Sequence, residues 1–431
     1  MSGPEEAARP ARFAKGYVWY VVFLLFLANV MNYVQRMVLS ILLPGIKADI
    51  DLSDTQLGLL LGGGFALFYA IAGVPLARLA DRNVRRSFLA GAIALWSVMT
   101  IALGLAQSFL QLLAARIGLG IGESICIPCS HSLLTDYVPP EKRPSAFGLH
   151  STGAVAGITL SLLLGGYLQT RVGWRYALFL MALPGLLLAL LIRLTLREPP
   201  RGYAEGATAA TEHVSVADVA RHLLSKKTYL WVLAAVCCGM LVEFGLNQWL
   251  PSYYVRQFGL SVSEVGFRYG LAVAAGGIPG SILGGFLTDR LLRRDVRWIV
   301  WVPAAAYVLA IPVGLGMLLA SSAPMALLLN GFYVFLVFAT NGAFWTACFV
   351  VVPPMMLATT SALTLLVAGV TGLALGPVLV GGLSDALASR AGDGSLRMSL
   401  VAVECLALGV VGAMWMASRS LEKEAAMGAT R

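Results

Sequence analysis

The sequence has few charged residues and none of the common catalytic motifs. Charged side chains make up 12% of its 431 residues, whereas a soluble globular protein carries about 25%. No Walker motif, H-E-x-x-H sequence or nucleophile elbow is present. The sequence therefore predicts neither an enzyme nor a protein that holds a metal ion or another cofactor.

Cysteine is also scarce, and all six cysteines lie inside apolar segments. Cys126-Ile-Pro-Cys129 has the spacing of a redox or metal-binding pair. Such chemistry requires a polar and accessible setting. We interpret these cysteines as small packing residues and expect no disulfide bond.

The long apolar runs dominate the sequence. Hydrophobic residues make up 58% of the chain, so most of it requires an apolar solvent. Each run is close to or longer than the ~20 residues that a helix needs to cross ~30 Å of hydrocarbon. A β-barrel would instead show short segments of alternating polarity. The sequence predicts an all-α integral membrane protein with twelve transmembrane helices, at residues 17–43, 57–79, 88–106, 109–134, 146–168, 176–196, 229–255, 265–287, 298–319, 325–351, 356–383 and 398–416.

The basic residues indicate the orientation of these helices. Most of the 31 Lys and Arg lie in the N-terminal segment and in every second loop after it. This is the positive-inside pattern, which predicts that both termini are cytoplasmic. The net charge of +9 then reflects topology, and we expect no binding to nucleic acid.

An internal repeat predicts two halves. The sequence L-x-D-R-x-x-R-R occurs at Leu79–Arg86 and again at Leu287–Arg294, 208 residues later. Six helices repeated in the same orientation are typical of a large class of transporters. We predict a tail at 1–16, a six-helix bundle at 17–197, a cytoplasmic linker at 198–227, a second bundle at 228–418 and a tail at 419–431. Residues 214–224 form either an interfacial amphipathic helix or part of a solvated linker.

Three ionisable residues are predicted to lie at bilayer depth. Arg36 is in the first helix, and Arg116 and Glu123 are in the fourth. Seven residues make almost two helical turns, so Arg116 and Glu123 share a face but stand ~10 Å apart along the axis. Charges in this position are costly and usually functional. We predict that Arg36 and Arg116 bind an anionic group and that Glu123 carries a proton or competes with the substrate for an arginine. A permanent ion pair that fixes helix packing is the alternative.

Polar and aromatic residues of the second half are further candidates for a binding pocket. The seventh predicted helix contains Glu243, Asn247, Trp249 and Tyr253, and the tenth contains Asn341 and Trp345. They either line a pocket or serve in packing and in the interfacial aromatic belt.

The loop motif, Arg116-x-x-x-Gly120 and the six-plus-six plan resemble the major facilitator superfamily. Within it, Asn32-Tyr33-Val34-Gln35-Arg36 and Gly173-Trp174-Arg175-Tyr176 resemble bacterial spinster-like transporters. This resemblance implies a monomer in the bacterial inner membrane. It also implies substrate binding by residue 35 and a cytoplasmic gate that includes Asp81, Arg85, Asp136 and Asp289.

Position 35 departs from that resemblance. The family usually has there an Asp that carries protons, whereas Gln35 cannot titrate. The chain is then a uniporter or exchanger, couples through Glu123 alone, or carries a substitution that traps one conformation.

The substrate implied by the resemblance is an amphiphilic, lipid-like anion such as a lysophospholipid or a sphingoid phosphate. A small organic anion such as a sugar acid, moved together with protons, is the second candidate, and drug efflux is the third. A membrane sensor that transports nothing is the alternative from another class.

Overall fold

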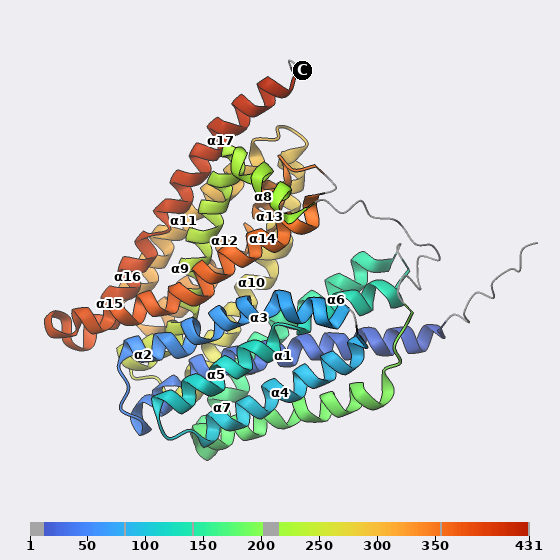
Figure 1. Cartoon of the computed structure of the whole chain (residues 1–431). Helices are drawn as coiled ribbons and strands as arrows, with labels where there is room; N and C mark the ends of the chain where they lie inside the picture. The colour runs from blue at the N-terminus through green and yellow to red at the C-terminus, as the bar shows by residue number, and fades with distance from the viewer. Residues whose placement is uncertain (1–12, 82, 140–141, 201–214, 354–355, 430–431) are drawn as a thin grey trace, which may run out of the picture.

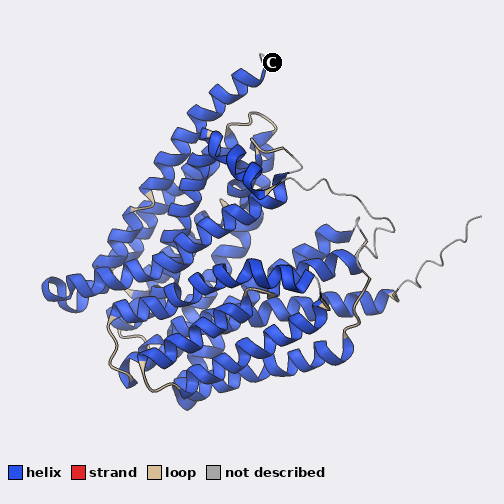
Figure 2. Cartoon of the chain, in the orientation of Figure 1, coloured by secondary structure: helices blue, strands red, loops and turns tan. Residues whose placement is uncertain are grey.

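The structure is a computed structural model that describes residues 13–81, 83–139, 142–200, 215–353 and 356–429. These residues form helices joined by short connections, and no strand occurs among them (Figure 2). The predicted all-α fold class is therefore confirmed.

The described residues of the N-terminal half form seven α-helices and one π-helical turn. The longest is α7, which contains a reversal at Gly173, where φ is +79°. Only glycine adopts this backbone conformation readily, so the chain turns there into the sixth crossing. The elements are α1 (Lys15–Asp49), α2 (Asp54–Gly58), η1 (Leu59–Gly63), α3 (Gly64–Asp81), α4 (Arg85–Leu105), α5 (Phe109–Glu123), α6 (Cys126–Tyr137) and α7 (Arg143–Thr195).

The C-terminal half follows a similar plan. It begins after a short helix, α8 (Val216–Ser225). Its elements are α9 (Lys227–Phe258), α10 (Val262–Leu292), α11 (Trp298–Leu319), α12 (Ala323–Phe338), α13 (Asn341–Phe349), α14 (Leu357–Gly369), η4 (Val370–Leu375), α15 (Gly376–Ala391), η5 (Gly392–Gly394), α16 (Ser395–Cys405) and α17 (Leu408–Ala429).

The described residues contain 10 helical stretches that are long and apolar enough to cross a membrane. Two of them, Ser145–Thr195 and Thr359–Leu421, are each long enough for two crossings. The first reverses at Gly173 and the second at Gly392. The arrangement is thus consistent with the twelve predicted helices.

The repeat is visible in how equivalent helices begin. Ser53 and Gln56 form a capping box at the start of α2. Ser261 and Glu264 form the same capping box at the start of α10, 208 residues later (261 − 53). Each serine accepts a backbone N–H that the first helical turn leaves unpaired. The spacing matches that of the repeated loop motif, so the two halves share one register over this region.

The two halves meet near one end of the molecule. In Figure 1 the bundles converge where α2 and α15 lie and diverge toward α6 and α8. Glycines allow the backbones to approach closely: a Cβ at Gly266 of α10 would lie 2.3 Å from the carbonyl oxygen of Leu162 in α7. Similarly, a Cβ at Gly62 of η1 would lie 2.3 Å from the carbonyl oxygen of Leu373 in η4. Small residues therefore hold the halves together at this end.

Residues 214–224 are predicted to form either an interfacial helix or part of a solvated linker, and most of them lie in a helix, α8. Its Val219 and Leu223 are buried against Tyr229 of α9, whereas Val216 and Leu224 are exposed. The apolar face of α8 thus covers the end of the C-terminal half. The predicted bounds of the tails and linker fall partly on residues 1–12, 201–214 and 430–431, outside the described residues, and stay a prediction.

Candidate functional site

A buried ion pair joins the first and fourth crossings of the N-terminal half. The Nε of Arg36 in α1 donates to Oε2 of Glu123 in α5 over 2.8 Å. The Arg36 side chain is 8% exposed and that of Glu123 is fully buried. Nη2 of Arg36 also donates to Oδ1 of Asn32, one turn earlier, over 2.9 Å. The structure therefore pairs Arg36 with Glu123, which is the ion pair that the sequence left open as an alternative.

Aromatic rings surround the guanidinium of Arg36. Its carbon lies 4.9 Å from the ring centre of Tyr33 and 5.2 Å from those of Phe65 and Tyr69. The negative faces of aromatic rings attract a cation, more strongly where water is excluded. The rings thus support the positive charge of Arg36 by contacts that do not use its hydrogen-bond donors.

The ion pair has unused hydrogen-bonding capacity. Oε1 of Glu123 is buried and has no hydrogen-bond partner among the described residues. Buried polar atoms are nearly always paired, and an exception calls for an explanation. A carboxylate that uses one of its two oxygens can accept a proton or another donor at the second. The pair is therefore a place where a proton or a ligand can enter.

Arg116 lies beside this pair but has other partners. Its side chain donates to the carbonyl oxygens of Leu60 and Leu61 in η1, at 2.9 and 3.3 Å, and of Arg36 in α1, at 3.0 Å. A π-helical turn interrupts the regular helical hydrogen bonds, and Arg116 binds carbonyl groups at this turn. Because Arg116 is fully buried, its predicted contact with a substrate would require a change of conformation and stays a prediction.

Gln35 faces the interior of the N-terminal half. Its Oε1 accepts from the hydroxyl of Thr100 in α4 over 2.7 Å, and its Nε2 donates to the Ser97 hydroxyl over 3.3 Å. The side chain is fully buried. Its amide is thus satisfied by α4, and its predicted role in binding substrate also stays a prediction.

The predicted binding residues of the C-terminal half divide into two groups. Trp249 and Tyr253 are buried and donate to the carbonyl oxygens of Pro377 and Leu318, at 3.0 and 2.9 Å. These contacts are those of packing residues. Asn247 is partly exposed and accepts from the hydroxyl of Tyr269 over 3.2 Å.

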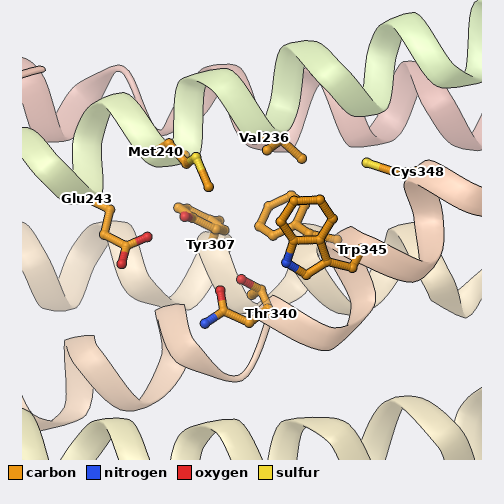
Figure 3. Close-up of a pocket in the computed structure, with 10 residues that line it drawn as sticks. Val236, Met240, Glu243, Tyr307, Thr340, Trp345 and Cys348 are labelled. Carbon is orange, nitrogen blue, oxygen red and sulfur yellow. The ribbon is translucent and has the colours of Figure 1, made fainter. Parts of the chain in front are cut away.

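Asn341 and Trp345 belong to the second group because they line a pocket. This pocket lies between α9, α11 and the junction of α12 with α13, and it holds about 40 Å³ of free volume. Figure 3 shows Glu243 and Met240 projecting from α9 toward Thr340 and Trp345. The pocket brings Asn341 and Trp345 together with Glu243, a third candidate from the sequence.

The predicted cytoplasmic gate is only partly described. Arg85 at the start of α4 forms an ion pair with Asp136 of α6. It also pairs with Glu198, which follows α7, over 2.8 Å. Nothing in the sequence indicated Glu198 as a partner. The structure does not describe the side chain of Asp81. The side chain of Asp289 is exposed.

A further ionic cluster connects the two halves, and no sequence pattern predicted it. Asp54 at the start of α2 accepts two hydrogen bonds from Arg256 of α9, at 2.7 and 2.8 Å, and one from the Ser384 hydroxyl of α15, at 2.8 Å. Lys47 of α1 also donates to Asp54, over 2.6 Å. The Asp54 side chain is 4% exposed. The cluster closes the end of the molecule at which the halves converge.

Asp385 of α15 strengthens the same contact. Its carboxylate accepts from the backbone N–H groups of Asp54 and Thr55, at 3.0 and 2.7 Å, and from the Thr55 hydroxyl, at 2.6 Å. A carboxylate at a helix start is favoured by unpaired N–H groups and by the helix dipole. One half therefore caps a helix of the other. The sequence did not indicate that Asp385, near the end of an apolar run, contacts the start of α2.

Comparison with known proteins identifies the family. The model of the Major Facilitator Superfamily matches residues 25–377. The chain belongs to the Major Facilitator Superfamily. A superfamily member described as an MFS-type efflux pump, from Mycolicibacterium smegmatis, is 31% identical over 98% of this chain and 99% of its own length. The hexuronate transporter of Bacillus subtilis is 28% identical over 90% of this chain and 93% of its own.

A solved structure makes the relationship more specific. It is that of a bacterial homologue of the human lysosomal transporter Spinster, in an inward-facing and unoccupied conformation. It is 31% identical, with a TM-score of 0.87, and the match covers 95% of this chain and 99% of that one. The chain is therefore a spinster-like member of the superfamily, as its helix-1 and loop motifs predicted.

Proposed function

We propose that this protein is a secondary transporter that moves an amphiphilic, lipid-like or organic anion by alternating access. The observation that carries the proposal is the buried Arg36–Glu123 pair with its unpaired carboxylate oxygen. A buried ion pair that serves only a structural role needs hydrogen bonds at all of its remaining polar atoms. An ion pair that exchanges partners needs an oxygen or nitrogen atom that is free to accept a new partner.

The exchange follows from charge balance in a site of low polarity. When an anion takes the guanidinium of Arg36, Glu123 is left without its cation. A buried, unpaired carboxylate is strongly disfavoured, so Glu123 takes up a proton as the anion binds. Release of the anion restores the ion pair and returns the proton. Binding of the anion and of a proton are thereby coupled even though Gln35 cannot titrate.

The arrangement of the two bundles supports a direction from which the site opens. The positive-inside pattern favours cytoplasmic termini in a bacterial cell, and with that orientation the end with Asp54 faces outward. The Asp54 cluster then closes the outer side, and the cytoplasmic side is the one at which the bundles diverge (Figure 1). The similarity to an inward-facing spinster homologue supports this assignment. We propose that Asp81, Arg85, Asp136 and Asp289 belong to the opposite, cytoplasmic gate.

The surroundings of Arg36 favour a lipid-like anion over a sugar acid. Three aromatic rings lie within about 5 Å of the guanidinium, and among the described residues Glu123 and Asn32 accept its side-chain hydrogen bonds. A polyhydroxylated acid needs many polar partners, and an apolar tail needs none. The similarity to a hexuronate transporter keeps the sugar acid as the second candidate, and the similarity to an efflux pump keeps drug export as the third.

A binding experiment with a lipid anion, a sugar acid and a neutral lipid tests the proposed substrate class. Purified protein is titrated with oleoyl lysophosphatidate, glucuronate and neutral monoolein while its Tm is followed. Ligands that bind the folded state raise Tm with concentration. We expect lysophosphatidate alone to do so. A larger shift with glucuronate would favour the sugar acid, and an equal shift with monoolein would show that the negative charge is not recognised.

The Glu123→Gln variant tests the coupling to protons. The amide keeps the shape of the side chain but cannot take up a proton. We expect anion counterflow in proteoliposomes to lose its dependence on pH. Glu404→Gln is the matched control, because Glu404 is also buried but is bound to Tyr333 in the other half, at 3.0 Å. An unchanged pH profile in Glu123→Gln would remove Glu123 from the coupling, and absence of flux in the parent protein would favour a sensor.

A further inference from the structure

The pocket of the C-terminal half contains a carboxylate that the proposed anion site does not use. Among the described residues that line it, Glu243 of α9 is the only acidic one, and none is Lys, Arg or His. Its carboxylate makes no ion pair or hydrogen bond with any residue that the structure describes. An ionised group at this depth without a partner is costly. The buried glutamates Glu123 and Glu404 differ from Glu243, since Glu123 pairs with Arg36 and Glu404 accepts a hydrogen bond from Tyr333.

The walls of this pocket suit a cation. Tyr307, Phe344 and Trp345 line it, and the rings of Tyr307 and Phe344 lie 6.1 Å apart in a T-shaped arrangement. Aromatic faces and one carboxylate are the groups that recognise organic ammonium ions. Asn341 is exposed, and Glu243 and Trp345 are partly exposed, so the pocket has a polar entrance. It is thus a binding pocket of the opposite polarity to the Arg36 site.

The size of the pocket restricts the cation. A free volume of about 40 Å³ holds about three water molecules, at 10–15 Å³ each. A primary ammonium group is a compact donor of three hydrogen bonds and fits this space together with its first methylene. A trimethylammonium group is bulkier and donates no hydrogen bond to Glu243, so we expect it to bind more weakly than a primary ammonium group.

The repeat gives independent support to a special role of Glu243. If the offset of 208 residues between the capping boxes at Ser53 and Ser261 is carried back along α1 and α9, Glu243 is the counterpart of Gln35 (243 − 35). In the first half the side chain at this position is neutral and is satisfied by Ser97 and Thr100. In the second half it is a carboxylate without such partners beside an open space. A residue that served only in packing would need partners of the first kind.

We propose that this pocket binds the primary ammonium group of an organic amine, with Glu243 as its counter-ion and with Tyr307 and Trp345 as its aromatic walls. The proposed ammonium site is separate from the anion site, because the two sites share no residue. A molecule that carries both an anionic and an ammonium group would engage both halves of the protein at once.

The test is calorimetric titration of the purified full-length protein with three ligands of equal chain length: hexylammonium, hexyltrimethylammonium and hexanol. We expect hexylammonium to bind at least about tenfold more tightly than either of the others. Glu243→Gln should remove this preference, since a charged hydrogen-bonded partner is worth about that factor or more. Glu243→Asp keeps the charge and should retain part of it.

Two further variants make the result decisive. Trp345→Leu should weaken hexylammonium binding several-fold and leave hexanol binding unchanged, which keeps the test available if Glu243→Gln does not fold. The double variant Arg36→Ala/Glu123→Gln removes both charges of the anion site and should bind hexylammonium as the parent does, so failure of the anion site is told apart from failure of this one. Equal affinity for hexylammonium and hexanol in the parent, or for hexylammonium in the parent and Glu243→Gln, would overturn the proposal.

Discussion

Replacing Arg36 by alanine should reduce the affinity for oleoyl lysophosphatidate by at least about tenfold. The guanidinium is the one buried cation of the site that a ligand can reach by displacing Glu123, whereas Arg116 is engaged with backbone carbonyls. A charge-assisted hydrogen bond contributes about 1.5–3 kcal/mol, which corresponds to a factor of about 10 to 150. The measurement is a titration of the purified variant with the anion at constant ionic strength.

The effect of this variant on folding must be separated from its effect on binding. Arg36→Ala leaves Glu123 buried without a cation, which costs about 3–5 kcal/mol of stability when one partner of a buried pair is removed. The double variant Arg36→Ala/Glu123→Gln removes both charges and should recover stability but not anion binding. Arg171→Ala is the charge-matched control, since Arg171 is exposed and stacks on Tyr167. If the double variant binds the anion as the parent does, Arg36 is not part of the site.

Replacing Asp54 by alanine should open the outer end of the molecule. The substitution removes four hydrogen bonds to Lys47, Arg256 and Ser384 and leaves Arg256 without its carboxylate. The hydrogen bonds from Arg256 and Ser384 to Asp54 form only while the two halves are in contact at this end. Their loss therefore destabilises only the conformation that is closed there. Because Lys47 and Arg256 are partly exposed, we expect the conformation that is closed at this end to lose about 2–3 kcal/mol of stability. This loss shifts the equilibrium toward the open conformation by about 30- to 150-fold.

Distances between spin labels measure this shift. Labels at Asp51 and Arg390, which are exposed on either side of the closed end, should show a longer distance in Asp54→Ala. Asp49→Ala is the matched control because Asp49 pairs with Trp174 and Arg175 of its own half, at 2.8 and 3.0 Å. An identical distance distribution in the parent and in Asp54→Ala would show that the cluster does not hold the halves together.

A pair of adjacent glycines gives a second, steric route to the same opening. A Cβ at Gly381 would lie 2.1 Å from the carbonyl oxygen of Asp54, which is backbone and cannot move aside cheaply. A Cβ at the neighbouring Gly382 would lie 4.0 Å from its nearest neighbour across the contact, an ordinary van der Waals distance. Gly381→Ala should therefore lengthen the same label distance and Gly382→Ala should not.

Much of the fold could be predicted because the responsible signals are local and periodic. The apolar runs indicated the membrane-spanning helices, and the repeated loop motif indicated the two halves with the offset that the capping boxes at Ser53 and Ser261 reproduce. The approach of Arg36 to Glu123 could also be anticipated, because two isolated charges at bilayer depth are stable only if they find partners.

The partners of Arg116 and those of Asp54 in the other half could not be predicted, because they lie far away in the sequence and no periodic pattern indicates such contacts. Arg116 is predicted to bind an anion, and this stays a prediction. In this conformation it donates to carbonyl groups of a π-helical turn, η1, which no pattern in the sequence indicates. Asp54 and Ser384 are 330 residues apart and belong to different halves. Such a pair exists only in one conformation, so it could not be found from either segment alone.

We propose that the Arg36–Glu123 pair lies in a cavity that opens to one side of the membrane at a time and binds an anion. Labelling of a Tyr33→Cys variant by a membrane-impermeant maleimide tests it most directly, on a background without the six native cysteines, because Tyr33 is partly exposed beside Arg36. We predict labelling from the cytoplasmic side alone, added labelling from outside when Asp54→Ala is introduced, and slower labelling in the presence of lysophosphatidate. Labelling from neither side, or labelling that the anion and the Asp54 substitution leave unchanged, would contradict the account.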